Sequence, residues 1–148
     1  MDQTIHASAV LVGAKAVLIR GPSGAGKSRL AWQLLQGALP QGFLKFARLV
    51  GDDRMQLEVH SGRLLVRPQA MLAGLIEIRG LGIRRVAFEP AAIVGLVVDL
   101  AAADAERLPA LGSATTELEG VKLPRLAVAP GAEALQMTLA YIGTAAGN

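Results

Sequence analysis

Short apolar runs separated by glycine-rich turns dominate the first part of the chain. The runs at 10–12 and 16–19 are split by Gly13-Ala14, a pattern that predicts two strands and suits a hairpin. A glycine-rich turn follows at 21–26. From 27 to 39 the apolar positions recur at helical spacing, which predicts an amphipathic helix. The order is therefore strand, glycine loop, helix.

The rest of the chain contains more predicted strands than predicted helices. Further strands are expected at 48–51, 55–59, 64–67, 75–78, 93–100 and 126–129. The second and third of these flank a turn and suit a hairpin. Helices are expected at 101–111 and 133–142. This mixture predicts a single α/β domain over residues 1–148, with a mixed sheet and flanking helices arranged in two or three layers.

Composition limits the possible classes of protein. The chain has 148 residues, which suits one domain, and 52% of them are apolar. The net charge of +3 comes from scattered basic residues, and only 3% of residues are aromatic. Nucleic-acid binding surfaces of the stacking type need basic and aromatic residues together. We therefore expect no nucleic-acid partner, and the absence of cysteine excludes disulfides and thiolate metal sites.

Hydropathy gives no sign of a membrane segment. The longest apolar stretch, 91–100, contains Gly95 and Asp99 and is shorter than the roughly 18–20 residues of a membrane span. The N-terminus lacks the basic and apolar regions of a signal peptide. We therefore expect a cytoplasmic protein without membrane contact.

One segment fits the phosphate-binding pattern G-x-x-x-x-G-K-[ST] without a mismatch. It consists of Gly21, Pro22, Ser23, Gly24, Ala25, Gly26, Lys27 and Ser28. Glycines let successive backbone N–H groups turn towards phosphate oxygens, and the following helix adds its positive end. Lys27 supplies a charge, and the Ser28 hydroxyl suits Mg²⁺. A turn that binds nothing is the alternative, but the preceding strand and the following helix favour a nucleotide site.

Two adjacent carboxylates, Asp52 and Asp53, follow a predicted strand. One carboxylate at such a place commonly holds Mg²⁺ beside the P-loop serine, and the other is free to accept a proton as a general base. An ordinary turn paired with Arg54 is the simpler alternative.

Three segments resemble the HPr kinase/phosphorylase family, in the family's order around the P-loop. Glu77–Ile83 looks like the family signature, Val50–Arg54 resembles its second motif, and Ile5-His6 resembles its N-terminal catalytic segment. The similarity runs from about 6 to 131. It implies a fold related to phosphoenolpyruvate carboxykinase, a hexameric assembly, and transfer of phosphate from ATP, with Mg²⁺, to a serine of the carrier protein HPr. Many members also catalyse phosphorolysis of that phosphoserine.

The resemblance also implies a set of site residues. The expected catalytic residues are His6, Lys27, Asp52, Asp53, Arg79 and Arg107. The expected metal ligands are Ser28, Asp52 and Glu77. Within this set, Asp53 matches the residue that accepts the serine proton, and Arg107 falls where the family has an active-site arginine.

Each of these matches has a simpler reading. His6 and Arg107 also suit exposed positions, Glu77 and Arg79 suit an ion pair on an exposed strand, and the glycines between them suit a turn.

The sequence departs from the family pattern in three places. The usual regulatory N-terminal domain is not seen before His6, and Arg29 stands where many members have an acidic residue. Ala132 and Glu133 replace the Arg and Asn of a segment linked to dephosphorylation, so we expect weak or absent phosphorolysis with kinase activity retained. The alternatives for the whole protein are a P-loop kinase for a small metabolite and a nucleotide-binding regulatory module without transfer activity.

Overall fold

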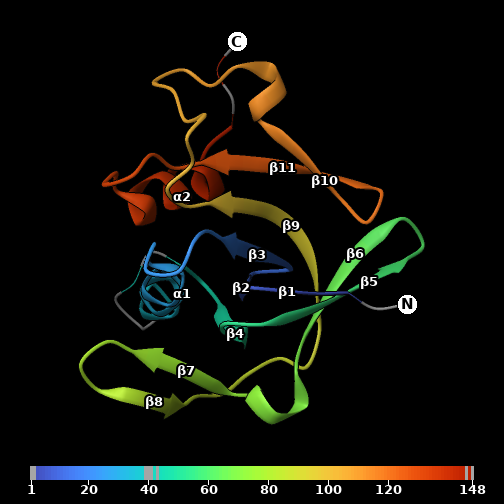
Figure 1. Cartoon of the computed structure of the whole chain (residues 1–148), viewed down its shortest axis with the longest axis vertical. Coiled ribbons are helices and arrows are strands. Elements are labelled where there is room, and N and C mark those ends of the chain that lie inside the picture. The colour runs from blue at the N-terminus through green and yellow to red at the C-terminus, as the bar shows by residue number, and fades with distance from the viewer. Residues whose placement is uncertain (1–2, 39–41, 43, 146, 148) are drawn as a thin grey trace.

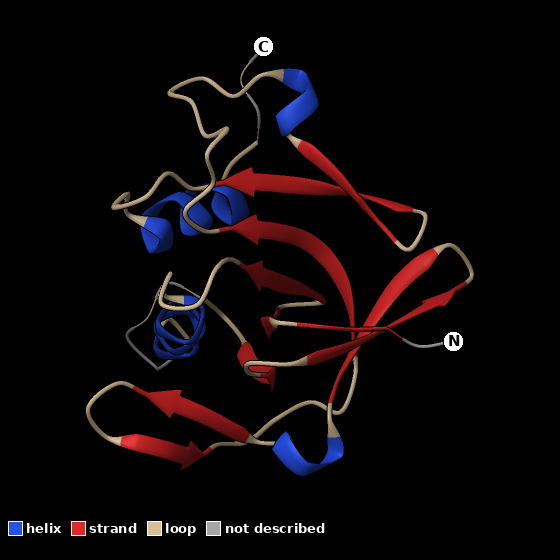
Figure 2. Ribbon diagram, in the orientation of Figure 1, coloured by secondary structure: helices blue, strands red, loops and turns tan. Residues whose placement is uncertain are grey.

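The fold is a curled mixed sheet with few helices, as the computed structural model shows (Figure 2). The structure describes residues 3–38, 42, 44–145 and 147. The strands are β1 (Gln3–Ile5), β2 (Ala7–Val12), β3 (Lys15–Arg20), β4 (Ala47–Gly51), β5 (Met55–His60), β6 (Arg63–Pro68), β7 (Leu75–Ile78), β8 (Gly82–Arg85), β9 (Ala92–Asp99), β10 (Thr115–Leu118) and β11 (Val121–Ala127). The helices are α1 (Lys27–Gln36), α2 (Ala134–Gly143) and two short 3₁₀ turns, η1 (Ala70–Leu72) and η2 (Leu111–Ser113).

Strand β9 is the centre of the sheet. The main path runs β1-β5-β6-β9-β3-β2-β4, and β11, with β10 beyond it, also pairs with β9. The first residues of β9 pair with β6, and its last residues pair with β11. The pairs β3–β9 and β9–β11 are parallel, so these three strands end at the same edge of the sheet. That edge faces α1 and α2, as the arrowheads in Figure 1 show.

Both faces of the central strands are covered, which explains their unbroken apolar runs. In β2 and β3, residues that alternate along each strand belong to two separate buried clusters, one of which includes Leu30, Ala31 and Leu34 of α1. Leu18 and Ile19 are fully buried on opposite faces. Each such side chain stabilises the fold by about 1.5–3 kcal/mol through burial.

Most predicted elements are confirmed. The two expected hairpins are β2–β3 and β5–β6, both antiparallel, and the strands expected at 48–51, 75–78 and 93–100 correspond to β4, β7 and β9. Helix α1 begins at Lys27 as expected and ends at Gln36, because Gly37 caps it; the predicted end at 39 lies outside the described residues. The last strand runs 121–127 rather than 126–129, and the last helix begins at Ala134.

The helix predicted over 101–111 is wrong. Ala101 has φ 53°, which is incompatible with a right-handed helix, and the Ala102 N–H donates to the Val128 carbonyl instead of a helical partner. Leu111 is 94% exposed, so the segment lacks a buried stripe that would stabilise a helix. The high helix propensity of the alanines in this segment is a weak preference, and the pairing with Val128 overrides it. Strands β1, β8 and β10, each three or four residues long, were not predicted.

None of the helices in the described part of the chain is long and apolar enough to cross a bilayer.

Candidate nucleotide and metal site

The glycine loop joins β3 to α1, as the sequence predicts. Gly24 and Gly26 have φ 82° and 101°, and a Cβ at either would meet open space, so backbone conformation rather than crowding requires glycine here. The first intrahelical bond runs from the Leu30 N–H to the Gly26 carbonyl, and no side chain caps the helix. The amides of residues 27–29 therefore point out of the helix start, which is a binding site for anions such as phosphate.

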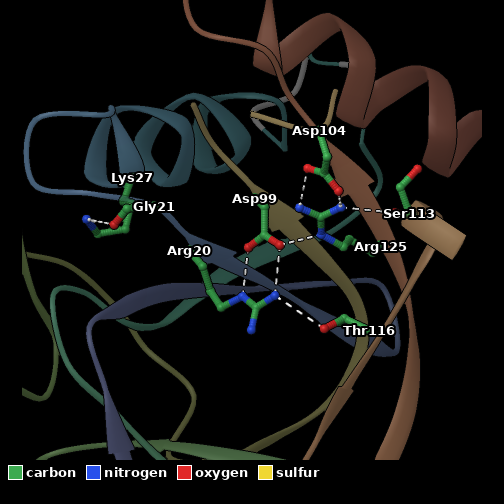
Figure 3. Close-up of polar contacts among 8 residues, drawn as sticks. All are labelled: Arg20, Gly21, Lys27, Asp99, Asp104, Ser113, Thr116 and Arg125. Atoms are coloured by element: carbon green, nitrogen blue, oxygen red, sulfur yellow. Dashed lines mark hydrogen bonds and ion pairs between the residues drawn. The ribbon is translucent and has the colours of Figure 1, made fainter. Parts of the chain in front are cut away.

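Lys27 lies across the loop that it follows. Its Nζ donates to the Gly21 carbonyl at 2.8 Å and to the Pro22 carbonyl at 3.2 Å (the first bond is drawn in Figure 3). These contacts hold the ammonium group against the start of the glycine loop. The residues present thus fit phosphate groups, since they combine amide donors, a helix start and one cation.

Asp52 is the polar centre of the site. Its side chain follows β4 and is buried, with 4% of the residue exposed. The Ser28 hydroxyl donates to its carboxylate, with 2.8 Å to each oxygen, and the backbone N–H of Glu77 donates to Oδ2 at 3.0 Å. The Ser28 hydroxyl and the backbone of the Glu77 segment therefore meet at the Asp52 carboxylate, which brings together the three residues expected to hold the metal.

Ser8 is a further member of this site that sequence reasoning missed. Its hydroxyl donates to Asp52 Oδ1, and its side chain is fully buried. Alternation along β2 puts Ser8 on the face that α1 covers, together with Val10. The sequence did carry a signal: Ser8 is the one polar residue in the run 7–12, and the remaining five residues are apolar.

Asp53 and His6 lie next to this centre, Asp53 in the turn between β4 and β5 and His6 between β1 and β2. Asp53 is exposed and has φ 74°, a left-handed conformation that Asp adopts more readily than most residues. The Ala7 N–H donates to the Asp53 carbonyl at 3.2 Å, which ties the turn to the start of β2. Arg54 Nη2 and His6 Nε2 are 2.8 Å apart, so the turn also holds the exposed His6 ring. The simpler reading of an Asp53–Arg54 ion pair is not seen among the described residues.

The Glu77 segment forms a separate two-stranded hairpin of β7 and β8. Ile76 is buried, and by strand alternation the Glu77 side chain is exposed, while its N–H bonds to Asp52. Gly80, with φ 83°, lies in the turn between the strands, and Gly82, with φ 100°, begins β8. Arg79 lies beside that turn and is exposed. The backbone of the segment belongs to the site, whereas the roles expected for the Glu77 carboxylate and for Arg79 stay predictions.

Arg107 is not placed with these residues by any observed contact. It is exposed in the irregular segment between β9 and η2, and it makes no hydrogen bond or ion pair with the described residues. Its proposed catalytic role stays a prediction.

A second polar cluster, which sequence reasoning also missed, lies at the base of the glycine loop and is drawn in Figure 3. It lies on the β9 side of β3, whereas β4, which Asp52 follows, lies beyond β2 on the other side. Arg20 donates to the two Asp99 oxygens at 2.7 and 2.8 Å. Arg125 donates from Nε to Asp99 and from its two terminal nitrogens to Asp104, at 2.8 and 3.0 Å. Because Arg20 immediately precedes Gly21, this cluster joins the base of the loop to β9 and β11.

Charge pairing dominates the electrostatics of that second cluster. Burial raises the pKa of Asp99, but the hydrogen bonds from Arg20 and Arg125 outweigh burial and hold the pKa below its ordinary value of 3.8. The hydrogen bond from Arg125 likewise lowers the pKa of Asp104, and that bond raises the pKa of Arg125. Asp99, Asp104 and Arg125 are therefore all charged near neutral pH.

The donor set around Asp52 fits Mg²⁺ better than metals that require several protein ligands. The described residues contain no group of three or more His, Cys, Asp or Glu side chains arranged to hold a metal. Mg²⁺ typically takes one or two carboxylates and completes its shell with water and substrate phosphates. The Ser28 hydroxyl and the Asp52 carboxylate, beside a phosphate-binding loop, match that requirement.

Comparisons with known proteins agree with this geometry. A solved structure, described as the Hpr(Ser) kinase/phosphatase from Coxiella burnetii, matches with a TM-score of 0.76 and covers 95% of this chain and 94% of that one. At 23% sequence identity this match shows the fold. HPr kinase/phosphorylase from Streptococcus thermophilus is 32% identical over 136 residues, covering 84% of this chain and 41% of the relative.

A further relative covers less of the chain. HPr kinase/phosphorylase from Clostridium beijerinckii is 35% identical over 82 residues, or 55% of this chain and 24% of the relative. The chain thus spans about two fifths or less of these curated relatives. The family model for the HPr Serine kinase C-terminal domain matches residues 1–139. Together with the fold and the Asp52 site, this match shows that the chain belongs to the HPr Serine kinase C-terminal domain family.

Proposed function

We propose that this protein transfers the terminal phosphate of ATP, with Mg²⁺, to a serine of the phosphocarrier HPr or a homologue. The observation that carries the proposal is the buried Asp52 carboxylate bonded to the P-loop hydroxyl of Ser28. That pairing is the usual arrangement for holding Mg²⁺ beside nucleotide phosphates. The names of the curated relatives supply HPr as the protein substrate.

The proposed division of labour follows from the position of each group. The amides of the glycine loop bind the phosphates, Lys27 supports the terminal one, and Ser28 and Asp52, with Glu77 as a further candidate, hold the metal. When bound, Mg²⁺ would neutralise charge on the phosphate oxygens. Asp53 takes the proton of the substrate serine as its oxygen bonds to the terminal phosphorus, and ADP leaves with the electrons of the broken bond. Catalysis is then chiefly positioning and charge stabilisation.

His6 has a supporting place in this scheme. Its exposed ring lies between β1 and β2 and contacts Arg54, the residue that follows Asp53. We propose that it stabilises charge on the transferring group together with Lys27. Arg79 and Arg107 stay candidates for the same task.

Phosphorolysis is proposed to be weak or absent. Ala132 and Glu133 lie in the exposed turn between β11 and α2, where the family pattern has Arg and Asn. A positive side chain that would orient phosphoserine or inorganic phosphate is missing from these two positions. Release of phosphate from phospho-HPr in excess inorganic phosphate measures this activity, and rapid phosphorolysis would contradict the proposal.

A phosphotransfer assay tests the main proposal. The protein is incubated with Mg²⁺, γ-labelled ATP and HPr from the same cell, and the modified residue is mapped. Label on an HPr serine supports the proposal. Label on a metabolite panel alone would favour a small-molecule kinase, and ATP binding without any labelled product would favour a regulatory module. The hexamer and the cytoplasmic location implied by the resemblance stay predictions.

The Asp53→Asn variant tests the proposed base. We expect turnover to fall about 10²–10⁴-fold while ATP affinity changes little, because general base catalysis contributes on that scale. Glu117→Gln, an exposed change on β10, is the matched control. Unchanged turnover in Asp53→Asn would remove this residue from the mechanism.

A further inference from the structure

A neutral pocket lies on the opposite side of the glycine loop from Asp52. Its volume is about 270 Å³, and its walls come from residues 24–25 of the loop, 100–101 after β9, and 128–132 with 134 after β11. In the sheet, β4 and its following Asp52 lie beyond β2 on one side of β3, while β9 and β11 lie on the other. The loop therefore has a carboxylate on one flank and this pocket on the other.

Backbone hydrogen bonds hold the walls of the pocket in place. The Leu100 N–H donates to the Arg20 carbonyl at 2.8 Å, immediately before the glycine loop. The Ala102 N–H donates to the Val128 carbonyl, and the Val128 N–H to the Asp99 carbonyl, both at 2.8 Å. These bonds join the ends of three parallel strands, and ligands of open α/β sheets bind outside such carboxyl ends.

The chemistry of the lining excludes a second phosphate as the preferred occupant. Every lining residue is Gly, Ala, Val, Leu or Pro, so the side chains offer neither charge nor hydrogen-bonding groups. A phosphate placed there would lose its hydration without gaining a cation. A flat, largely apolar ring loses little hydration free energy on entering such a pocket, and burial of its apolar surface stabilises the complex. The volume lies just below the about 300–1,000 Å³ of sites for whole drug-sized ligands, so it suits one ring system.

We infer that this pocket holds the nucleoside end of the nucleotide, with the base between Ala129 and the loop. The inference rests on the proposed function for its premise that the loop holds the phosphates. It gives the nucleotide a direction, with the terminal phosphate towards Asp52 and the base towards the end of β11. Because no lining side chain can read hydrogen-bonding groups on the base, ATP and GTP should bind with similar affinity.

Equilibrium titration with three probes tests the inference on the whole chain. The probes are ATP, GTP and inorganic triphosphate, each with Mg²⁺, because triphosphate reports on the loop without a base. The variants Ala129→Leu and Ala132→Leu fill the pocket from two positions of its wall. Ala14→Leu, an exposed change in the turn at the far end of β3, is the matched control.

In the wild type we expect ATP and GTP to bind within roughly tenfold of each other and both more tightly than triphosphate. In both pocket variants ATP and GTP should weaken by about tenfold or more, since the base loses its burial, while triphosphate binding stays within about twofold. The Ala14→Leu control should match the wild type. A variant that does not fold would bind no triphosphate and is replaced by the other.

Two results would overturn the inference. The first is that the folded pocket variants lose no more affinity for ATP than for triphosphate. The second is that the wild type strongly prefers one base. A raised KM for HPr with unchanged nucleotide affinity would assign the pocket to the protein substrate instead. Nucleotide binding as expected, but without transfer to HPr, would reject the proposed function and leave the base pocket standing.

Discussion

Two aspartates at strand ends flank the same glycine loop, yet their partners differ in kind. Asp52 follows β4 and receives two hydroxyl groups and one backbone N–H. Asp99 ends β9 and receives two guanidinium groups, from Arg20 and Arg125. Both are largely shielded from water, with Asp52 at 4% exposure and the Asp99 side chain at 15%.

The difference indicates what each carboxylate is for. A buried charge is costly unless an opposite charge compensates it. Arg20 and Arg125 already compensate Asp99, so that aspartate stabilises the fold. No ion pair in the described part of the chain involves Asp52, whose negative charge is left available for a bound cation. Hydrogen bonds from neutral donors orient the carboxylate without using up its charge.

Replacing Asp52 by Asn should give the largest effect on activity. We expect turnover to fall about 10²–10³-fold, since the proposed mechanism would lose the carboxylate that holds the metal. Stability without Mg²⁺ should stay the same or rise, because Asn removes an uncompensated buried charge. Steady-state kinetics and urea unfolding measure the two effects. Near-normal turnover in Asp52→Asn would contradict the proposed role of Asp52 in binding the metal.

Replacing Asp99 by Asn should have the opposite profile. We expect a loss of about 2–3 kcal/mol in the free energy of unfolding, because Arg20 loses its counter-charge and Arg125 keeps only the more exposed Asp104. Turnover per folded molecule should fall far less than in Asp52→Asn. Urea unfolding measures the loss, with Glu117→Gln as a surface control. A stability equal to that of the control would show that the cluster contributes nothing.

Acid should weaken the Asp99 contribution in a defined direction. Its pKa is lowered in the folded protein, so the unfolded chain binds more protons at low pH, and the stability due to Asp99 disappears as the pH falls through the folded-state value. The wild type should therefore lose more stability than Asp99→Asn between about pH 5 and about pH 3. Unfolding curves at both pH values measure this. Parallel losses in the two proteins would contradict the assignment.

The smallest effect is expected for Asp104→Asn. Asp104 pairs with Arg125, but its side chain is 54% exposed, and water and salt screen such pairs. The unfolding curve should nearly overlay that of the wild type. A loss approaching that of Asp99→Asn would show that the whole cluster, rather than Asp99, carries the stability.

Sequence patterns predicted the parts of the site that depend on neighbouring residues. The loop and α1 follow from a contiguous run of glycines and helical spacing, and Asp52 follows from its place after a strand. The pairing of Arg20, Asp99 and Arg125 was not predictable in this way, since it joins positions 79 and 26 residues apart. The helix expected over 101–111 fails for the same reason, because a distant carbonyl of Val128 takes the Ala102 N–H.

The pairing of β9 with strands from both halves of the chain has a kinetic consequence. Its partners β3 and β6 precede it, and β11 follows it, so the strand acquires its neighbours only when long segments have closed. Such non-local topologies fold slowly, in milliseconds to seconds, because loop entropy is lost before contacts form. The glycine loop lies at the end of β3, the strand that β9 pairs with in parallel. We therefore expect nucleotide binding to appear late during refolding, together with the last protection of β9 amides from exchange.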